Sequence, residues 1–466
     1  MSNQPGLEDS SAITMDKSPT TSTAMGNTPQ KSLLSRHSTH HSQAQSSKTN
    51  RHISAKDGFM TIVKSSWLNV MLVFVPIGIA SHFVWSPTIT FIMNFLAIVP
   101  LAKLLGFATE DIALRTGEII GGLLNATFGN AVELIISIIS LTQNLVVVVQ
   151  ASMLGSILSN LLLVLGMCFW GGGYYYKAQY FNKTVAQTSA SLLFISVASL
   201  LIPAAFYGSI HSAESASAAV LTQDILNISR ATAIILLILY FSYLLFQLRT
   251  HKHLFMGPSS PDIRRVSHAS LKVQDRQVLQ EEGHASHDDD EEEEEPQLPA
   301  WMAVTLLVVV TVIVGVCAEF LVSAIEEVTE LWHISETFVG LILLPIVGNA
   351  AEHLTAVTCA IKNKMDLALG VAVGSSMQIA LLVTPLMVII GWGMNVEMSL
   401  YFNIYETAVL LIAVIMVNYL IMDGESNWLE GLMLIAVYIV IAISFYYYPD
   451  GGSSTASSSN NSTLGA

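Results

Sequence analysis

The chain carries little charge and few cysteines. Only 12% of its 466 residues are charged, while 52% are hydrophobic, whereas a soluble domain carries about 25% charge. That deficit excludes an ordinary soluble protein and predicts an all-α polytopic membrane protein. The three cysteines, Cys168, Cys317 and Cys359, all lie in apolar segments, so no disulfide framework is expected. Nothing in the composition indicates nucleic-acid binding.

The N-terminus lacks the apolar core of a cleaved signal peptide, so membrane insertion would depend on the first span. Eleven apolar segments are each long enough to cross about 30 Å of hydrocarbon. They lie at about 67–85, 88–109, 117–141, 144–172, 185–207, 224–248, 300–325, 337–361, 366–392, 402–421 and 428–448.

These segments divide the chain into six parts. We expect a disordered cytosolic tail at 1–66, a first transmembrane helix at 67–87, five helices at 88–248, a cytosolic acidic loop at 249–298, five more helices at 299–448 and a C-terminal tail at 449–466.

Lys and Arg are absent from every connection predicted on one side of the membrane. These connections lie near 86–87, 142–143, 208–223, 328–336 and 393–401. Cytosolic connections of membrane proteins are enriched in Lys and Arg. The pattern therefore predicts a cytosolic N-terminus and a non-cytosolic C-terminus, and it supports the odd number of spans.

One seven-residue motif occurs twice. Residues 129–135 read GNAVELI and residues 348–354 read GNAAEHL. The same offset of 219 carries Gly155-Ser156 to Gly374-Ser375, and an offset of 216 carries residues 108–111 to 324–327. This pattern indicates duplication. Because each half has five spans, the halves should be inverted relative to each other, an arrangement that places the substrate site near the bilayer midplane.

Each motif contains an Asn and a Glu three residues apart, Asn130 with Glu133 and Asn349 with Glu352. Such pairs lie on one face of a helix. A charged residue at the bilayer centre costs about 2.5–3.5 kcal/mol on insertion scales, so two of them indicate function.

Calcium prefers six to eight oxygen ligands, some from carboxylates. Two glutamates could neutralise one divalent ion and, without it, would bind protons more readily. We therefore predict one site that binds either the cation or protons, as an antiporter requires. The alternative is that each Glu–Asn pair serves only helix association.

Other polar residues are candidates for the same site. Asn160 and Gln378 have amides that need partners in lipid, and Ser156, Ser159, Ser375 and Ser376 are either ligands or small packing residues.

Six further ionisable residues are candidates with more than one interpretation. His353 is either a proton relay or a histidine bonded across a helix interface. Glu110 and Glu326, with their neighbours Asp111 and Glu327, either line cation vestibules or are solvated helix ends. Glu319 lies deeper in its span and is a candidate for a relay or a gate.

An acidic run precedes the seventh span. It comprises Asp288, Asp289, Asp290, Glu291, Glu292, Glu293, Glu294 and Glu295. The run either concentrates divalent cations near the pore and so regulates transport, or is a solvated linker.

The paired motifs resemble those of the vacuolar cation/proton exchangers, in the calcium/cation antiporter superfamily, and are most similar to the fungal type. The resemblance covers about residues 60–450. It implies a vacuolar membrane location with a lumenal C-terminus, export of cytosolic Ca²⁺ in exchange for lumenal H⁺, no cofactor, and Glu133 and Glu352 as central ligands. Sodium coupling is disfavoured, and carriage of other divalent cations such as Mn²⁺ stays open, as does formation of a homo-oligomer.

An intramembrane hydrolase is the more distant alternative. It would need a nucleophile–base pair, paired catalytic aspartates or a His-x-x-x-His metal motif within a span. None is evident in the sequence, so we expect a secondary transporter and not an enzyme.

Overall fold

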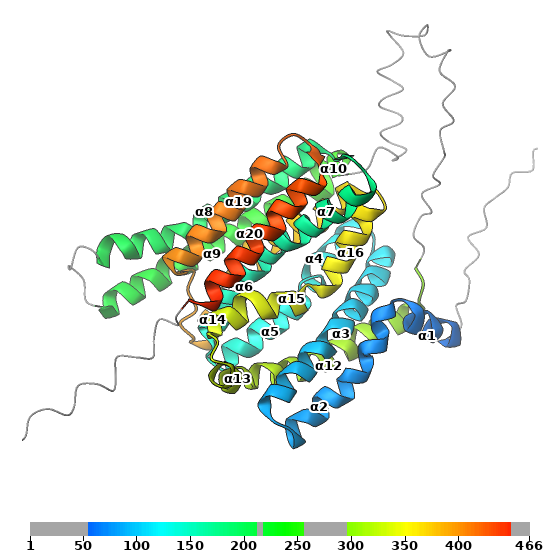
Figure 1. The fold of residues 1–466 in the computed structure, drawn as a ribbon, viewed down its shortest axis with the longest axis horizontal. Helices are drawn as coiled ribbons and strands as arrows, with labels where there is room; N and C mark the ends of the chain where they lie inside the picture. The colour runs from blue at the N-terminus through cyan, green and yellow to red at the C-terminus, as the bar shows by residue number, and fades with distance from the viewer. Residues whose placement is uncertain (1–54, 212–217, 256–295, 449–466) are drawn as a thin grey trace, which may run out of the picture. The chain divides into compact units, whose positions relative to one another are not determined.

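The computed structural model describes residues 55–211, 218–255 and 296–448, and these residues are almost entirely helical (Figure 1). The acidic run at 288–295, the tail before residue 55 and the C-terminal tail lie outside the described residues.

In the first part of the chain the elements are α1 (Ala55–Lys64), the 3₁₀-helix η1 (Trp67–Val73), α2 (Phe74–Val84), α3 (Pro87–Thr116), α4 (Glu118–Phe128), α5 (Ala131–Thr142), α6 (Val146–Leu158), the π-helix η2 (Ser159–Val164), α7 (Leu165–Tyr175), β1 (Gln179–Tyr180), α8 (Lys183–His211), α9 (Ala218–Leu245), the π-helix η3 (Phe246–Thr250) and α10 (Lys252–Phe255).

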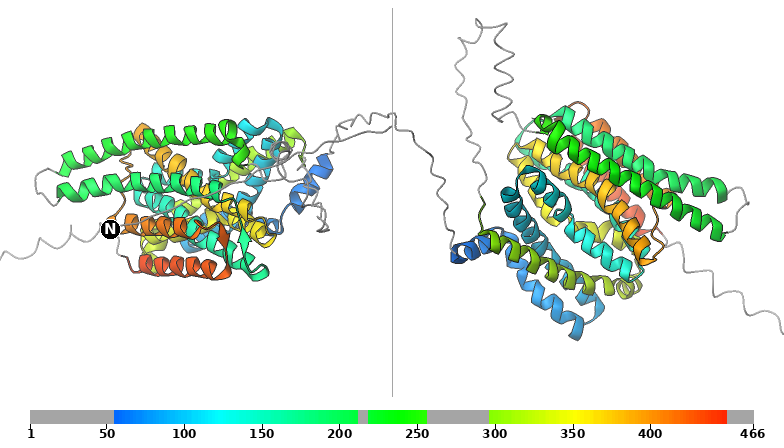
Figure 2. Two further views of the ribbon diagram at one scale, coloured as in Figure 1. Left: turned by 90° about the horizontal axis from the view of Figure 1, so that it is seen from above. Right: turned by 180° about the vertical axis from the view of Figure 1, so that it is seen from behind.

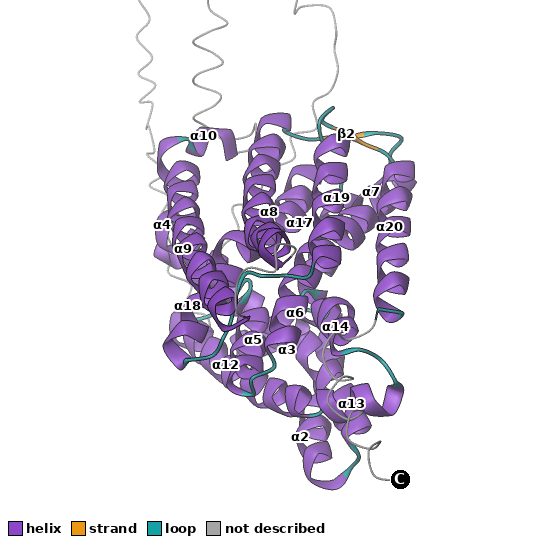
Figure 3. Cartoon of the chain, turned by 90° about the vertical axis from the view of Figure 1, so that its left-hand side faces the viewer, coloured by secondary structure: helices purple, strands orange, loops and turns teal. Residues whose placement is uncertain are grey.

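The second part contains α12 (Ala300–Ser323), α13 (Ile325–Trp332), α14 (Glu336–Phe338), the π-helix η4 (Val339–Leu343), α15 (Leu344–Gly348), α16 (Ala350–Ile361), α17 (Met365–Gln378), the π-helix η5 (Ile379–Val383), α18 (Thr384–Met394), α19 (Ile404–Leu420), β2 (Glu425–Ser426) and α20 (Trp428–Tyr446). Antiparallel strands β1 and β2 pair Gln179 with Ser426, and β2 lies near the ends of α7 and α19 (Figure 3).

The predicted apolar segments are helical, but the number of spans is not confirmed. Among the described residues, eight helices are long and apolar enough to cross a membrane, or nine if the pair 325–332 and 336–348, bent by 114°, forms one span. The segments 117–141 and 337–361 are interrupted by breaks, and α19 has only 17 residues. Each segment that carries the motif is therefore divided at the motif into shorter helices and does not form one helix of membrane-spanning length.

Helix α1 departs from the expectation of a disordered tail up to residue 66. Its Gly58 packs against the start of α12, where an added β-carbon would lie 2.7 Å from Met302 Sδ. Its exposed face carries Phe59 and Val63. Sequence composition did not reveal this helix because its partner surface is more than 200 residues away.

The two halves of the chain repeat the same local irregularities. Breaks occur after Gly129 and Gly348, and π-helical turns begin at Ser159 and Ile379. Asn144 and Asn363, 219 residues apart, both adopt left-handed backbone conformations, with φ of 61° and 58°. Repetition of irregular features, which no general helix preference would produce, supports duplication of one structural unit.

Repeat-related helices α3 and α12 pack side by side in opposite directions (Figure 1). Asp111, near the end of α3, accepts hydrogen bonds from the backbone just before α12. At the other end, Phe91 near the start of α3 contacts Trp332 at the end of α13, with ring centroids 6.0 Å apart. Antiparallel packing of equivalent helices is what an inverted repeat requires.

Two buried apolar clusters support these helices. The larger joins residues of α6, α7, α8, α17, α18, α19 and α20, and the smaller joins residues of α3, α5, α12 and α13. Helices α8 and α9 run alongside each other (Figure 2), and α9 also contributes residues to the larger cluster. Cys168, Cys317 and Cys359 do not form disulfide bonds.

Candidate functional site

The backbone leaves the helix at the asparagine of each motif. Asn130 has φ −102° and ψ 23°, and Asn349 has φ −92° and ψ 4°. A new helix starts at the next residue, which places Glu133 and Glu352 in the first turns of α5 and α16. The unpaired N–H groups of a helix N-terminus favour negative charge there, so each break helps to stabilise a carboxylate inside the protein.

The two motifs meet through Glu133. A β-carbon built on Gly348 would lie 2.8 Å from Glu133 Oε1 and 3.2 Å from its carboxyl carbon. Glu133 is only 6% exposed, and Glu352 lies near enough to interact with it electrostatically. Acids from the two halves of the chain therefore share one buried region.

A hydrogen bond also joins the halves at this point. The Asn130 side chain donates from Nδ2 to Gln378 Oε1 over 2.7 Å. Asn130 belongs to the first motif and Gln378 ends α17, the helix that follows the second motif. The sequence analysis grouped these two residues at one site, and the structure brings them together.

Several buried polar atoms around the motifs have no hydrogen-bond partner. They are Glu133 Oε1, Glu352 Oε2, both amide atoms of Asn349 and Asn160 Nδ2. Buried polar groups in proteins are nearly always bonded, so each exception needs an explanation. Three of these atoms are oxygens, the ligands that calcium prefers.

The described residues contain no group of three or more His, Cys, Asp and Glu side chains that could bind a metal. The two glutamates would therefore need amide, hydroxyl, backbone or water oxygens to complete the shell of a divalent cation. This need is consistent with the amides that surround them.

The serine candidates are buried, and one of them lies beside a motif glutamate. Ser375, on α17, is buried beside the Glu352 carboxyl. Ser156 is buried on α6, and the Ser376 hydroxyl lies 3.0 Å from the Ala372 carbonyl of its own helix and 3.4 Å from the Ile157 carbonyl of α6.

His353 Nε2 lies 3.3 Å from Ser159 Oγ, across the interface between the halves. This contact fits the interpretation of a histidine bonded between helices. A role in proton relay stays a prediction.

A close crossing of α6 and η4 fixes the helices next to the motifs. A β-carbon on Gly155 would collide with the backbone carbonyl of Leu341, and one on Gly340 would lie 2.8 Å from the β-carbon of Ala151. Glycine is required at both positions because the two backbones approach closely. Gly374, the repeat equivalent of Gly155, has no such neighbour within 4 Å.

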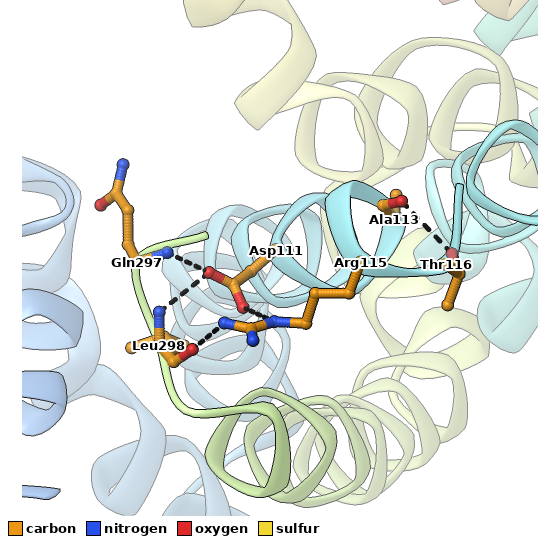
Figure 4. A network of polar contacts seen from close by, with 6 residues as sticks. All are labelled: Asp111, Ala113, Arg115, Thr116, Gln297 and Leu298. Atoms are coloured by element: carbon orange, nitrogen blue, oxygen red, sulfur yellow. Dashed lines mark hydrogen bonds and ion pairs between the residues drawn. The ribbon is translucent and has the colours of Figure 1, made fainter. Parts of the chain in front are cut away.

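The acids at the ends of α3 and α13 have different environments. Asp111 is buried, accepts hydrogen bonds from the backbone N–H groups of Gln297 and Leu298 at 2.5 and 2.9 Å, and pairs with Arg115 Nε at 3.2 Å (Figure 4). Arg115 also donates to the Leu298 carbonyl. Asp111 is thus a structural link to the start of α12 and does not line a vestibule.

Glu110 and Glu326 are exposed, as both a vestibule and a solvated helix end require. Glu319 is also exposed and accepts a hydrogen bond from Gln143 Nε2 at 3.2 Å. Roles in gating or relay stay predictions for these three residues.

The sequence analysis missed Lys103, a basic residue within α3. Its ammonium donates to Thr355 Oγ1 at 3.3 Å, and Thr355 lies one turn after Glu352 on α16. The signal was present in the sequence, because a lysine inside a predicted span is as unusual as a glutamate.

The repeated break, the buried acids and the antiparallel halves define a class of membrane protein, the ion transporters built from inverted repeats. The model of the family described as sodium/calcium exchanger protein matches residues 86–249 and 302–447. This chain belongs to that family. The family is one of ion exchangers, so the expectation of a transporter and not an enzyme is confirmed.

Curated relatives make the similarity more specific. A vacuolar calcium ion transporter of Schizosaccharomyces pombe is 46% identical over 387 residues, 83% of this chain and 86% of that one. A Ca²⁺/H⁺ antiporter of Aphanothece halophytica is 42% identical over 376 residues, 80% of this chain and 95% of that one. The expected resemblance to vacuolar calcium transporters and cation/proton exchangers is confirmed.

A solved structure has the same fold. Native YfkE is 33% identical, with a TM-score of 0.62, and the match covers 81% of this chain and 99% of that chain. The expected fold class of an all-helical antiporter is therefore confirmed.

Proposed function

We propose that this protein exchanges cytosolic Ca²⁺ for lumenal H⁺ across the vacuolar membrane, at a site formed by Glu133 and Glu352. One observation carries the proposal: the Glu133 carboxylate lies against Gly348 of the opposite motif, with an oxygen that has no hydrogen-bond partner. Two such acids can bind one divalent ion or protons. The relatives described as a vacuolar calcium ion transporter and a Ca²⁺/H⁺ antiporter support this choice of ions and membrane.

Each residue of the site would have a distinct role. Glu133 and Glu352 bind the cation directly and take up protons when it leaves. Asn349, with an unbonded amide oxygen, adds a neutral ligand. Asn130 and Gln378, joined at 2.7 Å, fix the distance between the halves. Because burial and mutual repulsion disfavour two charged carboxylates, the site is not stable without either ligand.

We also propose that access to this site alternates between the two sides of the membrane. Around Gly155 the α6–η4 crossing is closed, whereas around its repeat equivalent Gly374 no atom lies within 4 Å of an added β-carbon. Helix α4 has several exposed residues, whereas the equivalent stretch 337–348 is mostly buried. In an inverted repeat, exchange of these two environments would open one side and close the other.

By the distribution of basic residues, the more open side is the cytosolic one. Arg115 lies in the last helical turn of α3, just before α4, and Lys362 and Lys364 lie between α16 and α17. Cytosolic connections are rich in such residues. We infer from the same distribution a cytosolic N-terminus and a lumenal C-terminus, with five-helix halves at 88–248 and 299–448.

Calcium uptake into proteoliposomes with an acidic lumen tests the function. We expect uptake by the intact protein that stops when the proton gradient is collapsed, and no proton-driven uptake by Glu133→Gln or Glu352→Gln. Glu397→Gln, which neutralises an exposed acid outside the site, is the matched control and should retain uptake. Robust uptake by both site variants would refute the proposal.

The alternative is a sodium-coupled exchanger or a carrier of other divalent cations on the same scaffold. Replacing the proton gradient by a sodium gradient, and Ca²⁺ by Mn²⁺, in the same vesicles separates these cases. Uptake driven by sodium alone would favour the alternative.

A further inference from the structure

Lys103 is a positive charge inside a helix that is otherwise apolar around it. It lies on α3 between Ala102 and Leu104, both of which are buried. Lysines near the ends of spans usually extend to the membrane surface. Lys103 instead donates a hydrogen bond to Thr355 Oγ1 on α16, at 3.3 Å.

Thr355 is oriented to receive this bond. Its hydroxyl donates to the Ala351 carbonyl at 2.9 Å and so presents its oxygen lone pairs to the ammonium. Thr355 follows Glu352 by three residues on α16, and such residues are neighbours on a helix surface, with β-carbons about 5–6 Å apart. The ammonium is therefore held about one helical turn from a proposed cation ligand.

Glu352 has an oxygen, Oε2, with no hydrogen-bond partner. A lysine side chain has four rotatable carbons, and its ammonium can move by several ångströms without backbone change. From Thr355 it could turn to the Glu352 carboxylate, which would then be unavailable to a metal ion. The bond to Thr355 holds the ammonium away from that carboxylate.

The repeat supports a role for this position. The residue 216 positions later is Glu319, on α12. Lys103 joins α3 to α16, and Glu319 joins α12 to α5 through Gln143. The two positions thus carry opposite charges, and both contact a motif helix, but only Lys103 does so close to the motif, because Gln143 caps the far end of α5.

We infer that Lys103 is a built-in competitor of the transported cation, which sets the apparent Ca²⁺ affinity through its distance from Glu352, and that Thr355 determines that distance. The inference rests on the proposed function, because it needs Glu352 as a cation ligand. Lys103 is a specificity-determining residue that acts by its charge, and Thr355 is a positioning residue.

The test is the KM for external Ca²⁺ in full-length protein in sealed vesicles with an acidic lumen. Lys103→Met should lower KM by about 5-fold or more, because a unit charge no longer opposes a divalent ion nearby. Lys103→Arg should keep KM within 2-fold of the intact protein. Lys362→Met, which removes an exposed lysine at the end of the same helix α16, should also leave KM within 2-fold.

Thr355→Val gives an independent prediction of opposite sign. Without the hydroxyl, the ammonium is free to pair with Glu352, so KM should rise at least about 3-fold. The double variant Lys103→Met/Thr355→Val should have the KM of Lys103→Met alone, because it lacks the Lys103 ammonium that the loss of the Thr355 hydroxyl would release. A purely structural role for the pair would lower the maximal rate of both single variants and would not move KM in opposite directions.

The outcomes separate the inference from the proposed function. Glu352→Gln, measured beside these variants, should abolish uptake if the proposed function is right. If Glu352→Gln is inactive but Lys103→Met and Thr355→Val keep KM within 2-fold, the inference is overturned and the function stands. If Glu352→Gln transports normally, both fail. If Lys103→Met does not reach the membrane, Thr355→Val still tests the inference. A KM of Thr355→Val that is equal to or lower than that of the intact protein overturns it.

Discussion

The Glu133 carboxylate lies against the α-carbon of Gly348, which has no side chain to displace it. An added β-carbon would be 2.8 Å from Oε1, inside normal contact distance. The glycine of the second motif therefore makes room for the acid of the first. This contact explains the glycine of the second motif, although the backbone of Gly348 itself is helical.

Gly348→Ala should impair transport without unfolding the protein. The first atom met is the end of a flexible side chain, so the backbone can stay in place while the carboxylate moves. We expect the KM for Ca²⁺ to rise about 10-fold, equivalent to roughly 1.4 kcal/mol. Gly315→Ala, where no atom lies within 4 Å of the new β-carbon, is the control. An unchanged KM for Gly348→Ala would contradict the geometry.

Gly155→Ala should destabilise the fold, because its β-carbon would meet the backbone of Leu341 and not a movable side chain. Such overpacking typically costs about 1–3 kcal/mol. The measurement is the thermal unfolding midpoint in detergent. Equal midpoints for Gly155→Ala and the intact protein would show that α6 and η4 are not closely packed.

Gly374→Ala should behave differently although Gly374 is the repeat equivalent of Gly155. Its β-carbon meets nothing within 4 Å, and alanine in a helix interior is favoured over glycine by up to about 1 kcal/mol, so stability should be kept or improved. If access alternates, Gly374 must pack closely in the opposite conformation, and uptake should fall. Stable protein with full uptake would argue against exchange of the two environments.

Asp111→Ala should loosen the connection between α3 and α12. The side chain of Asp111 is 1% exposed and that of its partner Arg115 is 30% exposed. Removal leaves one guanidinium and two backbone N–H groups without their acceptor, at a cost of about 2–3 kcal/mol. A lower unfolding midpoint is expected, whereas Asp57→Asn on the exposed face of α1 should have no effect. An unfolding midpoint equal to that of the intact protein would show that Asp111 does not stabilise the connection between α3 and α12.

The bond between Asn130 and Gln378 predicts energetic coupling. Replacement of each by alanine, alone and together, should show an interaction energy of about 0.5–1.5 kcal/mol in Ca²⁺ binding. Additive effects of the two single variants would mean that the 2.7 Å contact contributes nothing to the site.

The pattern of the sequence predicted the parts of the site that depend on local chemistry. The repeated motif and the offset of 219 indicated duplication, and Asn130 and Gln378 were both candidates for one polar site. The breaks after Gly129 and Gly348 support duplication, and a hydrogen bond brings Asn130 and Gln378 together, whereas their roles in cation binding stay predictions.

Contacts between distant segments could not be predicted in the same way. The role of Lys103 was missed because its partner Thr355 is 252 residues away. Asp111 was interpreted as either a vestibule acid or a solvated helix end because its partner, the backbone before α12, is 186 residues away. The number of spans was not confirmed because helices broken at the two motifs are shorter than a lipid-spanning length requires.

Proton release on Ca²⁺ binding tests the central claim most directly. Purified protein in weakly buffered detergent solution is titrated with Ca²⁺ while a pH indicator records the released protons. The account predicts proton release that saturates together with Ca²⁺ binding, and loss of this release in both Glu133→Gln and Glu352→Gln. Saturable Ca²⁺ binding without proton release, or unchanged release in both variants, would contradict it.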